Sequence, residues 1–272
     1  MKFAGETALI TGASSGIGTA FAHELARQGA GLVLVARSED RLRSLAAEIT
    51  ATHGVRVDVL PIDLARPGAG EDLAGRVAAL GRTVDVLINN AGFGTHGDVE
   101  HADPARLLAQ IQLNCAAVVD LTTRFLPAMT ARRRGAVVNV ASTAAFQPIA
   151  HMAVYAASKA FVLSFTEALW GEAKPQGVEV IAICPGATET AFFDVVGAEE
   201  ASFGRRRTPE QVVATTLRGL AHGRPSVVDG CANAMVANGQ RFLPHRAVLR
   251  LAERTVRRRE ASGRGPVRTA GA

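Results

Sequence analysis

The most constraining feature of the sequence is a repeated alternation between short apolar runs and longer segments of helical length. The apolar runs are rich in Val, Ile and Leu and lack a polar alternation, which is typical of strands covered on both faces. Strand–helix alternation of this kind predicts a parallel sheet joined by right-handed helical crossovers. We therefore expect a doubly wound α/β sandwich of the Rossmann type, with a single parallel sheet of about seven strands and helices on both faces. The expected strands are residues 7–10, 31–36, 55–60, 84–88, 135–140, 178–184 and 226–228, and the expected helices are residues 16–28, 39–53, 70–80, 105–132, 154–173 and 209–222.

The length of 272 residues allows one large domain of this kind, and no linker divides the chain before its end. We expect this domain to span residues 1–230, with an irregular segment at 188–207. A helical extension of the same domain is expected at 231–259. Residues 260–272, rich in Gly, Arg and small side chains, predict a disordered basic tail.

Composition limits the partners and the compartment. From Arg246 onward the chain carries eight Arg and two Glu, whereas the charges of residues 1–245 nearly cancel. The formal charge of +5 therefore describes a tail, and we expect no nucleic-acid partner. The three cysteines have no metal-ligand spacing, so we expect reduced thiols, no metal and a cytoplasmic location. The early first strand and the lack of a long apolar stretch predict no signal peptide and no transmembrane segment.

The glycine-rich sequence TGASSGIG (residues 11–18) lies between the first expected strand and the first expected helix. Glycines in such a turn let backbone N–H groups approach a pyrophosphate, and the helix N-terminus adds favourable partial charge. An ordinary tight turn is the alternative interpretation. We expect a dinucleotide site whose candidate contacts are Gly12, Ser14, Ser15, Gly16, Ile17 and Gly18.

The end of the second expected strand indicates which dinucleotide binds. Strands that bind NAD usually place Asp or Glu about 20 residues after the glycines, where the carboxylate holds the ribose 2′-hydroxyl. Here the strand ends with Ala36, which is followed by Arg37 and Ser38. A guanidinium in place of a carboxylate favours a 2′-phosphate, so we expect NADP(H) rather than NAD(H). The alternative is that Arg37 is a solvated cation at a strand end.

With its further motifs, the chain resembles the classical short-chain dehydrogenase/reductase family, in an NADP(H)-preferring form with a C-terminal extension. The resemblance covers roughly residues 5–190. The motifs occur in the order that the family has, and each is weak alone but specific in combination. They are TGASSGIG, Asp63-Leu64, NNAG (residues 89–92), Asn114, Ser142, YAASK (residues 155–159) and Pro185-Gly186.

The resemblance implies an NAD(P)-dependent oxidoreductase that interconverts a ketone or aldehyde with an alcohol by hydride transfer. Asp63 would bind the adenine ring, and the segment 188–207 would be a mobile substrate lid. Asn89 has two open roles, because it would either shape the floor of the cofactor cleft or stabilise the sheet. The further cofactor contacts that the resemblance implies are Leu64, Asn90, Ala91, Gly92, Tyr155, Lys159, Pro185, Gly186, Thr188 and Thr190.

Tyr155 is the only tyrosine of the chain, and Lys159, one of three lysines, follows it at i+4. The two share one helix face, so we expect the cation to lower the pKa of the phenol and make it a general acid/base. Ser142 follows the expected strand 135–140, where it can hydrogen-bond the substrate oxygen, although a helix-cap role is the alternative. The resemblance further implies that Lys159 holds the nicotinamide ribose. Asn114 would interrupt its helix and hold a water that links Lys159 to solvent, or else be structural.

The candidate pocket is mostly apolar, so we expect a small hydrophobic carbonyl or alcohol substrate and the activity of a carbonyl reductase. One alternative is a 3-oxoacyl reductase that uses residues 205–207, all arginine, to recognise a phosphate-bearing acyl carrier. Another is a non-catalytic regulatory protein that senses NADP(H), which would predict the loss of Ser142, Tyr155 or Lys159. The candidate pocket residues are Phe93, Thr95, Ala144, Phe146, Met152, Phe192 and Phe193.

The chain continues for 42 residues after the sequence VVDG (residues 227–230), near which compact family members end. Apolar residues among arginines predict a basic amphipathic helix at 245–259. Three roles stay open for it: capping the substrate pocket, packing at a subunit interface, or peripheral contact with an anionic membrane. We expect a homodimer or homotetramer, and the extension puts the usual tetramer in doubt.

Overall fold

The computed structural model describes residues 3–190, 206–239, 244 and 249. The predictions for Phe192 and Phe193, and for most of the expected lid, lie outside the described residues. The same holds for nearly all of the chain after residue 239, including the expected basic helix and the tail.

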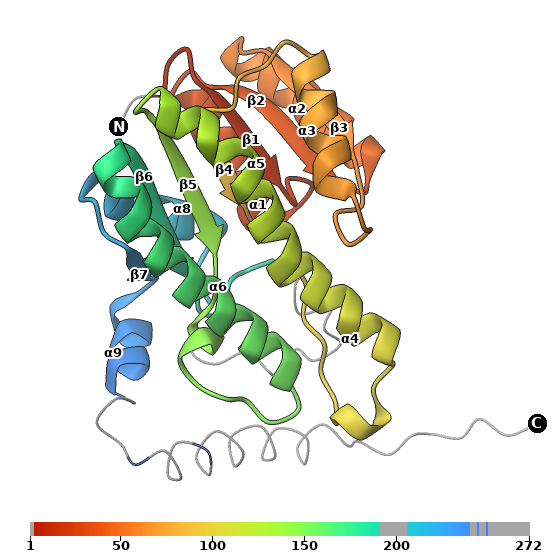
Figure 1. The fold of residues 1–272 in the computed structure, drawn as a ribbon, viewed down its shortest axis with the longest axis vertical. Helices are drawn as coiled ribbons and strands as arrows, with labels where there is room; N and C mark the ends of the chain where they lie inside the picture. The colour runs from red at the N-terminus through yellow and green to blue at the C-terminus, as the bar shows by residue number, and fades with distance from the viewer. Residues whose placement is uncertain (1–2, 191–205, 240–243, 245–248, 250–272) are drawn as a thin grey trace, which may run out of the picture.

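A single parallel sheet of seven strands organises the chain, in the order β3-β2-β1-β4-β5-β6-β7 (Figure 1). Every pair of neighbouring strands is parallel. The order reverses between β1 and β4, which is the position where doubly wound sheets bind ligands. The predicted fold class is confirmed. The strands are β1 (Thr7–Thr11), β2 (Gly31–Ala36), β3 (Val57–Pro61), β4 (Val86–Asn89), β5 (Gly135–Val140), β6 (Val178–Cys184) and β7 (Ser226–Val228).

The strands lack a polar alternation because the central ones are buried on both faces. In β2, Leu32 and Leu34 belong to one hydrophobic cluster, whereas Val33 and Val35 belong to the cluster on the opposite face. All four side chains have no exposed surface. Helices therefore have to cover both sides of the sheet, as the sequence predicts.

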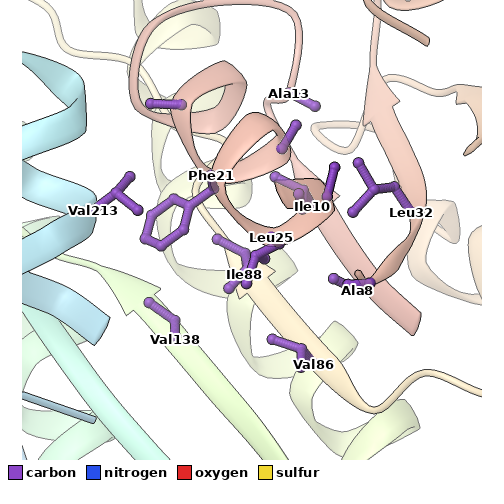
Figure 2. Close-up of a cluster of buried hydrophobic side chains, with 14 of the residues drawn as sticks. Ala8, Ile10, Ala13, Phe21, Leu25, Leu32, Val86, Ile88, Val138 and Val213 are labelled. Atoms are coloured by element: carbon purple, nitrogen blue, oxygen red, sulfur yellow. The ribbon is translucent and has the colours of Figure 1, made fainter. Parts of the chain in front are cut away.

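Among the residues that the structure describes, three helices cover each face. Helices α1 (Gly16–Arg27), α2 (Glu39–His53) and α8 (Pro209–Ala221) supply the first cluster, in which Phe21 of α1 projects toward Val213 of α8 (Figure 2). The opposite cluster takes side chains from the other three. Those helices are α3 (Ala69–Ala79), α5 (Ala117–Ala131) and α6 (Ala153–Ala173). Four shorter helical elements lie elsewhere in the chain: η1 (Val99–His101), η3 (Thr143–Phe146), η4 (Lys174–Gln176) and α9 (Cys231–Gly239).

The helix predicted over residues 105–132 is divided in the structure. It begins as α4 (Pro104–Ile111), where the carboxylate of Asp103 accepts a hydrogen bond from the amide of Ala105. A π-helical turn, η2 (Gln112–Ala116), then joins α4 to α5. Such turns often occur at functional sites. The predicted interruption at Asn114 is confirmed, because this residue is the centre of η2.

The parallel strands place their carboxyl ends at one edge of the sheet. The loops that leave this edge carry the glycine-rich sequence, the residues after β2 and β3, NNAG, Ser142 and the turn after β6. This edge is therefore the candidate site. Within the described part of the chain, none of the helices combines the length and the apolar composition that are needed to cross a membrane.

Candidate active site

The glycine-rich loop is shaped by close contacts that leave no room for side chains. Gly12 and Gly16 have φ angles of 64° and 56°, which favour glycine. A Cβ on Gly18 would collide with the carbonyl oxygen of Gly12. Asn90, a predicted cofactor contact, donates from Nδ2 to the carbonyl oxygens of Thr11 (2.9 Å) and Gly12 (3.1 Å). The side chain of Asn90 thus fixes the loop to NNAG, a long-range contact that an ordinary tight turn does not need.

The N-terminus of α1 presents hydrogen-bond donors toward this loop. The amides of residues 16–18 have no acceptor among the residues that the structure describes, and the N-cap residue Ser15 makes no side-chain cap bond. Ser14 is half-buried beside it, and Ile17 packs against the hydrophobic core. Open amides at a helix N-terminus attract anions. This arrangement fits the pyrophosphate of a dinucleotide.

The residues predicted to select NADP(H) lie at the ends of β2 and β3. Arg37 is exposed and has no ion-pair partner within the described part of the chain. Ser38 is the N-cap residue of α2 and makes no side-chain cap bond. Asp63 follows β3, where its carboxylate accepts from the amide of Ala65 (3.0 Å), and Leu64 is buried. A free guanidinium beside an uncapped helix N-terminus fits a 2′-phosphate.

The first asparagine of NNAG belongs to the sheet. Asn89 donates to Asn139 of β5 (2.9 Å) and to the hydroxyl of Thr122 (3.3 Å), and Asn139 in turn donates to Thr166 of α6 (2.9 Å). All four side chains are buried. Of the two roles left open for Asn89, these contacts favour the structural one. The amide of Ala91 is also engaged, since it donates to Thr11 Oγ1.

Asn114 joins three segments of the site. Its Oδ1 accepts from the amide of Phe93 (3.1 Å), and its Nδ2 donates to the carbonyl of Phe93 and to Ser158 Oγ, both at 3.0 Å. Both Nδ2 hydrogens of Asn114 therefore bond to other residues of the protein, so Asn114 could hold the predicted water only by accepting a hydrogen bond from it. A Cβ on Gly92 would lie 2.9 Å from Asn114 Oδ1 and 3.5 Å from Lys159 Nζ, so this corner requires a glycine.

The structure brings Ser142, Tyr155 and Lys159 together at the carboxyl end of β5. The Tyr155 hydroxyl is hydrogen-bonded to the Ser142 side chain. Ser142 also caps η3, where its Oγ accepts from the amide of Ala144 (3.1 Å), so the cap role is observed and the bond to a substrate oxygen stays a prediction. Lys159 Nζ donates to the carbonyl of Val140 (2.8 Å) and lies 5.9 Å from the centroid of the Tyr155 ring.

Burial has the largest effect on the pKa values of Tyr155 and Lys159. It raises the pKa of Tyr155 to about 12, opposed by the hydrogen bond with Ser142. It also lowers the pKa of Lys159 to about 8. The expectation of a lowered phenol pKa is therefore wrong for this arrangement, because desolvation outweighs the attraction of the Lys159 amine, which is held by Val140. At neutral pH the phenol is protonated and can donate its proton.

The lowered pKa of Lys159 predicts a pH-dependent stability. Between pH 7 and 9 the unfolded lysine binds more protons than the folded one, so the contribution of Lys159 to the free energy of unfolding should rise with pH. For a shift from 10.5 to about 8, this contribution is about 1 kcal/mol between those two pH values. Urea unfolding of the wild type and of Lys159→Met at both pH values measures it. A gap between the two proteins that does not change with pH would show that the folded lysine titrates normally.

Two of the predicted pocket residues pack beside the tyrosine. Ala144 and Met152 form a small buried cluster with Tyr155, and Ile149 packs against them. Ile149 was not predicted, because it belongs to no motif and follows η3 in an irregular segment. Phe146 packs against a different cluster, made by α5, α6, β6 and Ala141, which follows β5, so the structure does not bring it into the same group.

The other two described pocket residues lie on the loop after NNAG. The guanidinium of Arg106 lies over the Phe93 ring, 5.7 Å from its centroid. Thr95 donates from Oγ1 to Gln110 Oε1 (2.8 Å), and Gln110 is fully buried. Neither Arg106 nor Gln110 was predicted, because each reaches the loop only through the packing of α4.

The turn after β6 closes the edge of the site. Thr188 is buried and donates to the carbonyl of Gly186 (3.1 Å). A Cβ on Gly16 would lie 2.7 Å from Thr190 Cγ2, so this turn touches the glycine-rich loop. Pro185, which begins the turn, is also buried. The predicted pyrophosphate and nicotinamide contacts are thus adjacent.

Comparison with known proteins agrees with this geometry. The family model described as short chain dehydrogenase matches residues 6–201. The chain belongs to the short-chain dehydrogenase family. This confirms the resemblance inferred from the motifs, and this short-chain dehydrogenase therefore belongs to a family of oxidoreductases.

Its relatives include reductases of acyl substrates. It is 33% identical over 234 residues to the very-long-chain 3-oxoacyl-CoA reductase of Anas platyrhynchos, covering 84% of this chain and 72% of that protein. It is 30% identical over 225 residues to ketoacyl reductase HetN of Nostoc sp., covering 82% and 78%. Among solved structures, a short-chain dehydrogenase from Sphingobium yanoikuyae in complex with NADPH has a TM-score of 0.80 and 31% identity, covering 98% of each chain.

Proposed function

We propose that this short-chain dehydrogenase is an NADP(H)-dependent reductase of hydrophobic ketones or aldehydes. The observation that carries the proposal is the protonated Tyr155 phenol, which is hydrogen-bonded to Ser142 and lies beside the Lys159 amine. A phenol whose pKa is about 12 is protonated at neutral pH, so it has a proton to donate. The non-catalytic alternative predicts the loss of one of these three residues, and all three are present.

NADP(H) is the cofactor that fits the edge of the sheet. The open amides of residues 16–18 would hold the pyrophosphate, Arg37 the 2′-phosphate and Asp63 the adenine ring. The NADPH of the Sphingobium yanoikuyae structure supports this choice. When bound, the nicotinamide supplies the hydride for the reduction.

The side chains of the protein manage the proton. Ser142 would hydrogen-bond the carbonyl oxygen of the substrate, which gains negative charge as reduction proceeds. Tyr155 would then donate its proton to that oxygen, so the alcohol forms and a phenolate is left. The cationic form of Lys159 stabilises this phenolate electrostatically. Asn114 positions the site, because it fixes the Phe93 backbone and Ser158 together.

A 3-oxoacyl thioester is the second candidate substrate. The names of the relatives from Anas platyrhynchos and Nostoc sp. favour it. The apolar wall of Ala144, Met152 and Ile149 beside Tyr155 suits either an acyl chain or another hydrophobic group. The homodimer or homotetramer, the cytoplasmic location and the membrane contact of the C-terminal helix stay predictions.

A matched substrate panel tests the proposal. The purified protein is incubated with NADPH and either 3-oxoacyl thioesters of increasing chain length or hydrophobic ketones without a thioester, and loss of nicotinamide absorbance is followed. We expect turnover that rises with the apolar size of the substrate. A kcat/KM that is higher for thioesters than for ketones of equal length would identify an acyl-chain reductase. If no carbonyl compound is reduced although NADPH binds, the proposed function is wrong.

A further inference from the structure

The turn after β6, residues 185–190, depends on distant residues for its position. The backbone of Arg207 pairs with it on both sides of Thr188: the Arg207 amide donates to the carbonyl of Ala187 (3.0 Å), and the amide of Glu189 donates to the carbonyl of Arg207 (2.9 Å). The place of Thr188 is therefore set by the place of Arg207.

Arg207 is in turn held by a buried carboxylate. Its Nε donates to Asp229 Oδ2 (2.6 Å), and Thr215 Oγ1 donates to Asp229 Oδ1 (2.7 Å). The Asp229 side chain has no exposed surface, whereas that of Arg207 is 30% exposed. The Asp229 amide also donates to the carbonyl of Cys184, the last residue of β6 (3.1 Å). Asp229 thus connects the end of β7 to the end of β6 and, through Arg207, to the segment around Thr188.

A residue of α9 also contacts this turn. Asn233 Nδ2 donates to the carbonyl of Asp229 (2.7 Å). The amide group packs so closely against Gly186 that a Cβ there would collide with Nδ2. Helix α9 belongs to the C-terminal extension, so the extension forms one wall of the turn.

We propose that Asp229, Arg207 and Asn233 form a positioning device, the Asp229 bracket, which fixes residues 185–190 for nicotinamide binding. None of the three is proposed to touch the reacting atoms. Arg207 fixes the segment around Thr188, Asn233 fixes Gly186, and Asp229 sets the distance between them. The inference rests on the proposed function in one respect, which is that this turn contacts the nicotinamide.

The test uses Asp229→Asn, which keeps the shape of the side chain and removes its charge. The matched control is Asp58→Asn. Asp58 lies on β3, at the opposite edge of the sheet, and its carboxylate forms an ion pair with Arg82 (2.7 Å). Fluorescence titration gives the dissociation constant for NADPH, and hydrogen exchange of the protein without cofactor reports on the amides of this turn, which are those of residues 186–190. Melting temperatures show how much each variant is destabilised.

For Asp229→Asn we expect NADPH affinity to fall on the order of tenfold and kcat to fall further, with faster exchange over residues 185–190. The control should lose thermal stability while keeping NADPH affinity and exchange in this turn. Asn233→Ala, which keeps the ion pair, should change both readouts in the same direction by less, and provides the test if Asp229→Asn does not fold.

The outcomes separate this inference from the proposed function. Unchanged exchange over residues 185–190, or NADPH affinity equal to that of the control, would overturn the bracket. A wild-type protein that binds no NADPH would overturn the proposed function instead. The exchange experiment decides on the bracket in either case, because it needs no cofactor.

Discussion

Replacing Tyr155 with phenylalanine should lower kcat for carbonyl reduction by about a hundred- to ten-thousand-fold, while NADPH binds nearly as well as to the wild type. The substitution removes only the hydroxyl. The ring keeps its contacts with Ala144 and Met152, so the cluster should stay intact. What is lost is the proton donor, which is protonated at neutral pH because burial raises its pKa to about 12.

Turnover with the best substrate of the panel and the dissociation constant for NADPH should both be measured. Ser164→Ala is the matched control, since it removes an exposed hydroxyl from the same helix. The control should behave as the wild type. If Tyr155→Phe retains turnover close to that of the wild type, Tyr155 is not the proton donor, and the neighbouring hydroxyl of Ser142 becomes the candidate.

The strands could be predicted because they are buried on both faces, but their ends depend on partners that are distant in sequence. The run 84–88 stops before a polar residue, whereas β4 (Val86–Asn89) continues through Asn89, which pairs in register with Asn139 of β5 and donates from its side-chain Nδ2 to the Oδ1 of Asn139. Similarly, β3 (Val57–Pro61) includes its proline, which lies at the end of an edge strand where a missing N–H is tolerated.

The candidate site shows the same division between local and long-range information. The i+4 spacing in YAASK is local, and the structure indeed places Lys159 beside the Tyr155 ring. The pKa of the phenol could not be predicted, because it depends on how completely the surrounding loops exclude water. The contact of Asn233 with Gly186 was also out of reach, since a helix beyond the last strand has no sequence signal for what it packs against.

Replacing Arg37 with alanine should weaken the binding of NADPH by about ten- to a hundredfold and leave that of NADH nearly unchanged. Arg37 is exposed at the end of β2 and has no ion-pair partner within the described residues, so its charge is available to a ligand. A charge-assisted bond to phosphate is worth about 1.5–3 kcal/mol, which corresponds to that range of affinity. The preference for NADPH over NADH should therefore decrease by the same factor.

Dissociation constants for NADPH and NADH, measured for the wild type and for Arg37→Ala, check this expectation. Arg224→Ala is the matched control, because Arg224 is also exposed but precedes β7 and so lies at the opposite end of the strands. Raising the salt concentration should reduce the advantage of NADPH in the wild type more than in the variant, since salt screens an exposed ion pair. Equal losses for the two cofactors would contradict phosphate pairing, because NADH has no 2′-phosphate for Arg37 to bind.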